Sequence, residues 1–211
     1  MTEAKHKERK KRARRMIKKL KKLYPVAKTV LVYSNNREAL VSIILSAQCT
    51  DKKVNEVTAK LFKKYKTLDD YVNAKPSAFE KDIYQTGFYR AKTKNILGAA
   101  KMLKEEFGGR LPKTMDEMIK LPGVARKTAN IALHLAYGIQ VGVPVDTHVK
   151  RLAYKYKLTD HTDPKKIEQD LMEVLPKEEW VPTTYRLVQY GRDYCPAKKH
   201  DHASCPLTKL L

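Results

Sequence analysis

Residues 121–151 bring a phosphate-binding turn, an amine and a carboxylate close together in the sequence. The segment begins Leu-Pro-Gly-Val-Ala-Arg-Lys-Thr-Ala and ends Val-Asp-Thr-His-Val-Lys-Arg. Pro122 and Gly123 interrupt the chain before a run of helix-favouring residues, which predicts a tight turn that opens a helix. The first amide groups of such a helix lie at the positive end of its dipole and have no partner within it. The turn is therefore suited to hold a nucleic-acid phosphate without reading base sequence.

Lys127 lies in the first turn of this predicted helix and is the candidate nucleophile. The helix dipole, neighbouring Arg126 and partial burial would together favour its free amine, which can attack a carbon atom. The other interpretation is an ordinary solvated lysine on a basic helix. The sequence around Lys127 therefore points to covalent chemistry on a nucleic acid but leaves the simpler role open.

Asp146 precedes a run in which Val149, Leu152 and Ala153 follow helical spacing, so it is predicted to be an N-cap residue. A capped carboxylate is held ionised by the amides that donate to it. Close to Lys127, such a carboxylate could stabilise a cationic sugar or help to move protons. The alternative is that Asp146 only caps the helix.

The elements that position these residues are predicted to be helices. Apolar residues recur at helical spacing in three segments. These are Val54, Val57, Leu61, Phe62 and Tyr65; Ile96, Ala100, Leu103 and Phe107; and Ile167, Leu171, Val174 and Leu175. Proline, glycine and Asn35-Asn36 interrupt the chain often enough to predict about ten short helices. Residues 29–33 are the one strand-like stretch, and we expect them to be helical or extended. The predicted fold class is all-α.

Further motifs resemble the endonuclease III group of DNA glycosylases in the helix-hairpin-helix superfamily. They are Ile44-Leu45-Ser46-Ala47-Gln48-Cys49-Thr50-Asp51, Gly87-Phe88-Tyr89-Arg90-Ala91-Lys92 and Tyr190-Gly191-Arg192-x-x-Cys195, in addition to the hairpin and Val-Asp. The match runs in order over residues ~30–205. The resemblance implies a two-lobed fold with a DNA cleft between the lobes. It predicts a basic segment 1–28 that belongs to the second lobe, a six-helix lobe 29–139 containing the hairpin, and the rest of the second lobe at 140–211.

The same resemblance implies roles for individual residues. Lys127 and Asp146 match the catalytic pair. Gln48 matches the residue that fills the space left by a flipped nucleotide, and Phe88 matches an apolar wedge that is usually smaller. The residues implied in DNA binding are Gln48, Lys92, Phe88, Gly123, Ala125 and Arg126. The residues themselves also allow a core aromatic at position 88 and a helix-end residue at position 48. Ala125 replaces a glycine of the family, which is tolerable if its dihedral angles are helical.

The C-terminal region departs from the family pattern. The family holds an iron–sulfur cluster with four cysteines spaced C-x₆-C-x₂-C-x₅-C, whereas this chain aligns Cys195, His202, Cys205 and Leu211 with them. The chain has three cysteines in total, so a four-cysteine 4Fe–4S cluster cannot form within it. We expect no cofactor and a degenerate loop. Zinc held by Cys195, His200, His202 and Cys205 is one alternative, since all four are zinc-ligand types, and another metal arrangement is the other.

Composition supports a nucleic-acid partner. Lys and Arg number 44 against 23 Asp and Glu, for a net charge of +21. Residues 1–22 supply only part of it, so the basic character extends over the globular region. Met16, Ile17 and Leu20 could dock the inner half of residues 5–22, while the outer half would be a mobile charge run. No apolar run approaches the ~18 residues of a membrane span, and the cysteine pattern predicts an intracellular, reducing location in the cytoplasm or nucleoid.

The expected function is a bifunctional DNA glycosylase with AP lyase activity in base excision repair. It would remove oxidised or damaged pyrimidines from double-stranded DNA, as a monomer. A related glycosylase of mismatch or purine specificity is one alternative, although Lys127 argues against those branches. A non-catalytic helix-hairpin-helix DNA-binding protein is another, and it would need the hairpin and the charge but not Lys127 with Asp146.

Overall fold

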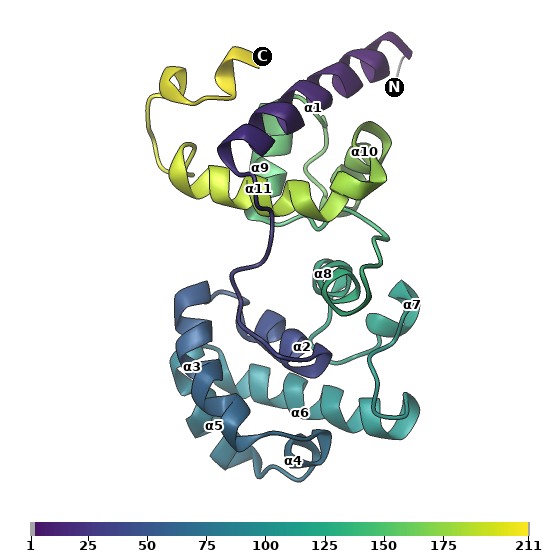
Figure 1. The fold of residues 1–211 in the computed structure, drawn as a ribbon, viewed down its shortest axis with the longest axis vertical. Coiled ribbons are helices and arrows are strands. Elements are labelled where there is room, and N and C mark those ends of the chain that lie inside the picture. Colours follow the sequence, from purple (N-terminus) through teal and green to yellow (C-terminus); the bar gives the residue numbers. More distant parts are fainter. Residues whose placement is uncertain (1–2, 211) are drawn as a thin grey trace. The chain divides into compact units, whose positions relative to one another are not determined.

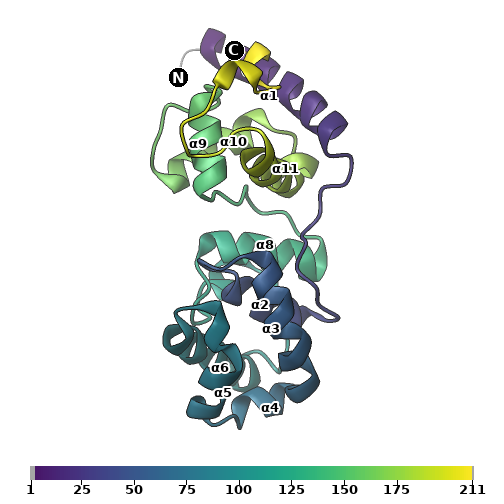
Figure 2. The same cartoon turned by 90° about the vertical axis from the view of Figure 1, so that its left-hand side faces the viewer.

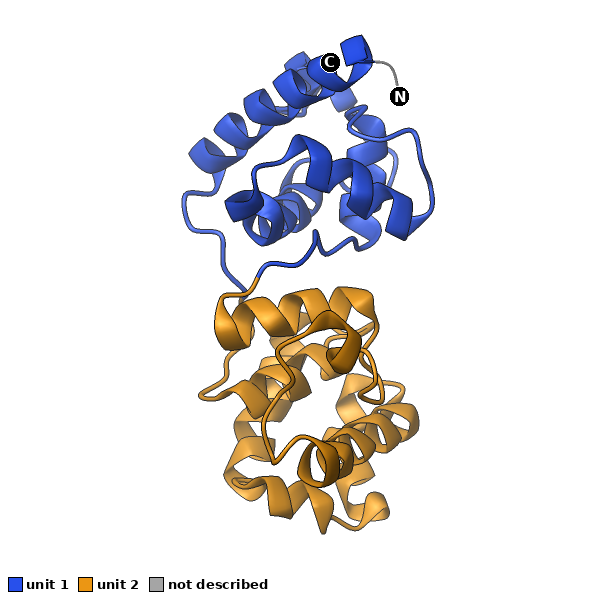
Figure 3. Ribbon diagram, turned by 90° about the vertical axis from the view of Figure 1, so that its right-hand side faces the viewer, with its two compact units in different colours: residues 1–29, 140–211 blue, residues 30–139 orange. Residues whose placement is uncertain are grey.

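The computed structural model describes residues 3–210, which form eleven α-helices and four short 3-10 helices and contain no strand. The predicted all-α class is confirmed. The contacts divide the chain into two compact units, residues 30–139 and the described parts of 1–29 and 140–211 (Figure 3). The first of these contains α2 (Asn36–Leu45), α3 (Asp51–Lys64), α4 (Leu68–Val72), α5 (Pro76–Ile83), η1 (Tyr84–Thr86), α6 (Tyr89–Glu106), α7 (Met115–Met118) and α8 (Arg126–Tyr137). The other contains α1 (Glu3–Leu23), α9 (Thr147–Lys155), α10 (Pro164–Val174), η2 (Lys177–Glu179), α11 (Trp180–Asp193), η3 (His202–Ser204) and η4 (Thr208–Leu210).

Helix ends follow the local signals in the sequence. Asn35 caps α2 by accepting a hydrogen bond from the amide of Glu38 at 3.0 Å. Pro76 and Pro164 are the first residues of α5 and α10, where proline loses no helical hydrogen bond. Gly138 ends α8 in the left-handed conformation, with φ +68°. These boundaries depend on residues within a few positions, which is why the sequence predicts them.

The unit of residues 30–139 is built around α2, which is buried from Glu38 to Leu45 and packs against α3, α6 and α8 (Figure 1). The predicted apolar faces of α3 and α6 are buried except for Phe62 and Phe107, which are half-buried. Residues 29–33 are neither helical nor part of a strand, so of the two expected conformations the helical one is wrong. Instead, the amide of Val32 donates to the Asn55 side chain at 3.0 Å, which fixes this segment to α3.

The other unit has α9, α10, α11 and α1 around one core (Figure 2). The apolar face of α1 consists of Ala13, Met16, Ile17 and Leu20, and all four are buried. The C-terminal segment lies beside α1, and the Arg15 guanidinium donates to the carbonyl oxygen of Leu210 at 3.5 Å. The predicted docking of the inner half of the basic segment is therefore confirmed.

The outer half of α1 is also docked, and the prediction of a mobile charge run there is wrong. Lys5 and Arg9 both pair with Asp160, at 2.6 and 2.5 Å. Arg9 is buried and also lies 3.5 Å from Asp170, and buried Arg12 donates to the carbonyl oxygen of Lys157. Carboxylates and a carbonyl oxygen from a distant part of the chain hold these residues, so the tertiary structure fixes their positions. Within residues 3–210, no helix combines the length and the apolar character needed to cross a membrane.

Candidate functional site

The turn before α8 requires glycine. Gly123 has φ +76°, and a Cβ built on it would lie 2.7 Å from Cβ of Asn95 on α6. Real Cβ atoms do not approach one another so closely, so a side chain here would have to displace α6 or the turn. The amide of Val124 donates to the carbonyl oxygen of Leu121 at 3.0 Å, which closes the turn. The backbone of the predicted hairpin is therefore tightly specified.

Helix α8 begins immediately after this turn. Ala125 precedes it with φ −81° and ψ 169°, an extended conformation rather than the helical one expected, but one that accommodates alanine. The first bond of the helical ladder runs from the amide of Ala129 to the carbonyl oxygen of Ala125 at 2.9 Å. Alanine cannot cap the helix with its side chain, so this N-terminus keeps the electrostatic character that suits an anion.

Arg126 and Lys127 are the first two residues of α8, and both are exposed. The prediction that Lys127 would be partly buried is therefore wrong. The structure confirms that Lys127 lies in the first turn of a helix that follows a glycine turn. From this position a long, flexible amine can reach a ligand whose phosphate is held at the same helix end.

Asp146 caps α9, as the sequence predicts. Its carboxylate accepts a hydrogen bond from the amide of Val149 at 2.8 Å, and the residue is half-buried. Two positions further, His148 faces α11, where a Cβ on Gly191 would lie 2.4 Å from the His148 ring. Gly191 thus allows α9 and α11 to approach closely beside Asp146. The sequence indicates Gly191 only as part of a motif, because this contact joins residues far apart in the chain.

Gln48 lies in the loop between α2 and α3 with its backbone in the left-handed region. Its φ is +52° and its side chain is exposed. Thr50 then caps α3 by accepting a hydrogen bond from the amide of Lys53. Left-handed conformations of residues other than glycine are uncommon and gather at functional loops.

Phe88 has the same unusual backbone conformation, with φ +48° and ψ +29°, and it precedes α6. Its side chain is 63% exposed, which rules out the alternative of a core aromatic. Among the described residues, only one further non-glycine position, Lys157, has a positive φ. Two of the three such positions are therefore residues that the resemblance places against DNA.

Lys92 connects the loops that carry Gln48 and Phe88. Its ammonium donates to the carbonyl oxygens of Leu45, at the end of α2, and of Thr86, just before Gly87, both at 2.8 Å. The side chain is only 4% exposed, and burial lowers the pKa of Lys92. An ammonium used in this way is not placed to bind a phosphate, so the DNA contact expected of Lys92 does not fit its position. Its position indicates that it orients the two loops.

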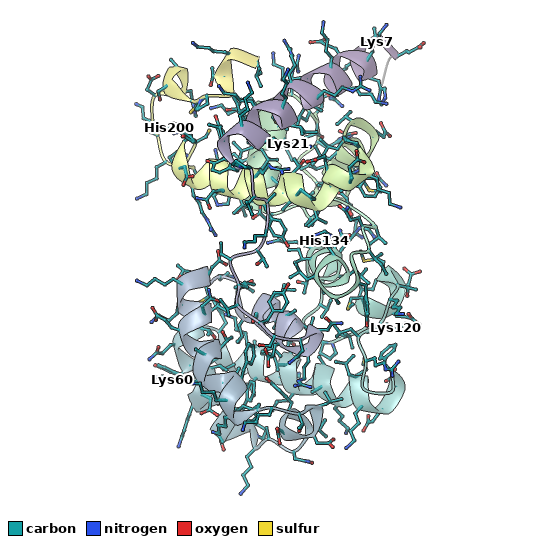
Figure 4. All side chains as sticks on the ribbon, viewed as in Figure 1. Lys7, Lys21, Lys60, Lys120, His134 and His200 are labelled. Atoms are coloured by element: carbon teal, nitrogen blue, oxygen red, sulfur yellow. The ribbon has the colours of Figure 1, made fainter. Side chains whose placement is uncertain are left out.

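Four candidate metal ligands meet in the C-terminal segment. One possible ligand atom from each of Cys195, His200, His202 and Cys205 lies within 4.8 Å of the other three. His200 is labelled on this segment in Figure 4, after α11. The group is too compact for a 4Fe–4S cube, whose four iron atoms bind ligands at separate corners. Leu211, aligned with the fourth cysteine, lies outside the described residues. The expectation of no cofactor is not confirmed.

Comparisons with known proteins find relatives among DNA repair proteins. Residues 41–177 match the model of the HhH-GPD superfamily base excision DNA repair proteins. The chain is 46% identical to endonuclease III of Synechocystis sp. over 95% of its own length and 92% of that protein. It is 42% identical to endonuclease III of Bacillus subtilis, over 91% and 88%.

A solved structure of a trapped covalent intermediate between endonuclease III and DNA matches with a TM-score of 0.89 and 40% identity. The match covers 95% of this chain and 94% of that one. The family model matches more than half of the chain, and these identities extend along nearly all of it. The chain therefore belongs to the HhH-GPD superfamily of base excision DNA repair proteins, within its endonuclease III group.

Proposed function

We propose that this protein removes damaged pyrimidines from duplex DNA as a DNA glycosylase and then cuts the strand as an AP lyase, with Lys127 as the nucleophile. The observation that carries the assignment of Lys127 is its place as the second residue of α8, directly after the glycine turn. The trapped covalent complex of a 40% identical endonuclease III supports a covalent route.

The reaction uses an amine and a carboxylate. Nζ of Lys127 attacks C1′ of the damaged nucleotide, and the bond from C1′ to the base breaks with its electron pair going to the base. Asp146 stabilises the positive charge that develops on the sugar. The sugar ring opens to a Schiff base, which acidifies the C2′ proton. Loss of that proton and departure of the 3′ phosphate oxygen cut the strand, and water then releases Lys127.

The base must leave the duplex before this attack, because its sugar bond is inaccessible while it is stacked. We assign Gln48 to the vacated space and Phe88 to a wedge between bases. An inserted aromatic offsets part of the few kcal/mol that unstacking costs. The exposure of both side chains and the rigid support from buried Lys92 favour this assignment. A phosphate would be held at the start of α8 by the Gly123 turn, Ala125 and Arg126, which directly precede Lys127 in the chain.

The second candidate is a DNA-binding protein without catalysis, which would need the hairpin and the charge alone. We favour the enzyme because the chain retains both Lys127 and Asp146 in the positions of the motif. We also infer that the protein acts on intracellular DNA as a monomer, because both residues of the proposed reaction lie in one chain.

Borohydride trapping tests the assignment of Lys127. Reduction during turnover of a duplex with one oxidised pyrimidine is expected to give a covalent protein–DNA adduct with the wild-type protein. Lys127→Gln should form none, and Lys101→Gln, at an exposed lysine of α6, should form as much as the wild type. An adduct of undiminished yield in Lys127→Gln would show that another amine is the nucleophile. Base loss and strand cleavage, scored separately, distinguish a bifunctional enzyme from a glycosylase alone or a binding protein.

A further inference from the structure

The C-terminal segment after α11 presents two thiols and two imidazoles to a common point. Cys195 follows α11, His202 begins η3 and Cys205 follows η3 directly, while His200 lies in the connecting loop. Both cysteines are buried, whereas His200 is half-buried and His202 exposed. A short 3-10 helix thus places ligands from both of its ends around the same space.

The distances within this group suit a single tetrahedral ion. Sγ of Cys205 lies 3.3 Å from Nε2 of His200 and 4.0 Å from Nδ1 of His202, and Sγ of Cys195 lies 4.0 Å from the same Nδ1. With zinc bonds of about 2.3 Å to sulfur and 2.0–2.1 Å to nitrogen, a tetrahedron places sulfur and nitrogen about 3.6 Å apart. We propose that Cys195, His200, His202 and Cys205 bind one zinc ion.

The histidine tautomer supports this proposal. Nδ1 of His200 lies 2.8 Å from the carbonyl oxygen of Lys198. A carbonyl can only accept, so Nδ1 carries the proton and Nε2 directs its lone pair towards Cys205. Metal-binding histidines are typically held in this way, by donation from the second ring nitrogen to a carbonyl or carboxylate. His200 is therefore oriented as a ligand.

Surrounding groups also fix Cys195. The guanidinium of Arg151 donates to the Cys195 carbonyl oxygen at 2.5 Å and lies 3.6 Å from Sγ. Nζ of Lys155 lies 3.6 Å from the same Sγ and contacts Nδ1 of His202. A bound zinc ion would take the place of the Lys155 ammonium at Nδ1 of His202. The Cys205 thiol would lose the proton that it donates to the Tyr194 carbonyl oxygen, because coordinating thiols lose their protons.

The same distances argue against iron–sulfur alternatives. A two-iron cluster with mixed ligands places both histidines on one iron and both cysteines on the other, separated by bridging sulfides. Here Sγ of Cys205 lies 3.3 Å from Nε2 of His200, which leaves no room for bridging sulfides between these two ligands. Two sulfur and two nitrogen ligands around one point are typical of zinc.

Such a site would be structural. Four protein ligands complete the coordination of zinc and leave no position for a substrate or a reactive water. The ion would tie residues 195–205 to the core of this unit, in which Cys195, Cys205 and Leu207 are buried. The amide of Leu207 also donates to the hydroxyl of Tyr190 on α11, so zinc and packing would act on the same segment.

Metal analysis of the full chain, purified without chelators, tests the proposal. We expect about one zinc per chain. The metal-free protein should take up Co²⁺ with the intense visible absorption of tetrahedral thiolate coordination. Removing zinc should lower the melting temperature, because structural zinc contributes directly to folding. A protein that contains neither zinc nor iron and takes up no Co²⁺, or one with stoichiometric iron and sulfide, would overturn the proposal.

Matched variants locate the site. His202→Ala removes an exposed ligand and should weaken zinc binding more than about tenfold, since even loss of a supporting group costs that much. Cys205→Ser should do the same, and if this buried change prevents folding, His202→Ala decides the question alone. The controls are Cys49→Ser and His161→Ala, which change a cysteine and a histidine outside the group and should keep full zinc content. Zinc retained at wild-type affinity in His202→Ala would refute the assignment.

Discussion

Gln48 and Phe88 show how single residues depart from backbone preference at the proposed DNA-binding loops. Each adopts the left-handed conformation, which costs a residue with a side chain about 1–2 kcal/mol. Glycine would remove this cost but would also remove the side chain that fills or wedges the duplex. The backbone strain at both positions fits a role of these side chains on DNA. The packing of the rest of the unit has to offset its energetic cost.

Asp146→Asn separates the structural and chemical roles of Asp146. Asparagine keeps an oxygen that can accept from the Val149 amide, so we expect the free energy of unfolding to change by less than about 1 kcal/mol. Loss of the negative charge should lower the rate of base excision on the order of 10²-fold, as when other stabilising groups are removed from active sites. Urea unfolding and single-turnover excision measure the two effects. Near-normal excision would leave Asp146 with only its capping role.

At the level of elements, Lys92 joins the end of α2 to the start of α6. Lys92→Met would leave the carbonyl oxygens of Leu45 and Thr86 without this donor in a buried place. We expect a loss of about 1–3 kcal/mol in the free energy of unfolding. Lys94→Met, at an exposed position of the same helix, is the control and should change little. Equal stabilities of the two variants in urea would contradict the orienting role of Lys92.

The docking of α1 should depend on pH through Asp160. Hydrogen bonds from Lys5 and then Arg9 hold the pKa of this carboxyl below its ordinary value. A depressed pKa stabilises the folded state above the unfolded pKa of about 3.9, and this contribution is lost as the pH falls further. Because the Asp160 side chain is 58% exposed, its contribution should be under about 1 kcal/mol.

Thermal unfolding followed by the fluorescence of Trp180, the single tryptophan, tests this dependence. The melting temperature of the wild type should exceed that of Asp160→Asn at neutral pH, and the two should converge below about pH 3. A difference that persists unchanged into strong acid would mean that the charge of Asp160 is not responsible.

For the whole molecule, the net charge of +21 predicts DNA binding dominated by phosphates. Basic side chains occur in both units, as Lys7, Lys21, Lys60 and Lys120 illustrate (Figure 4). If the protein neutralises about six phosphates or more, affinity for an undamaged duplex should fall at least about 10³-fold between 50 and 200 mM salt. Fluorescence anisotropy over a salt series measures the slope. Lys127→Gln should change that slope by about one phosphate at most. An affinity that hardly changes with salt concentration would contradict the prediction.

The sequence by itself determined what depends on neighbouring residues. The glycine turn, the helix that starts at Arg126 and the Asp146 cap follow from local backbone preferences and hydrogen bonds, so their residue types predict them. The all-α class follows from helical spacing in the same way. The endonuclease III resemblance came from motifs whose order and spacing are visible in the chain, and the comparisons confirm it.

Only the tertiary structure decided what depends on contacts between distant residues. It buried Lys92 against two carbonyl groups, left Lys127 exposed and docked the outer half of α1 through Asp160. It also brought Cys195 and Cys205 together with two histidines, where the residue types alone favoured a degenerate loop. Burial and the convergence of ligands are set by how helices pack, and local sequence patterns do not encode those distances.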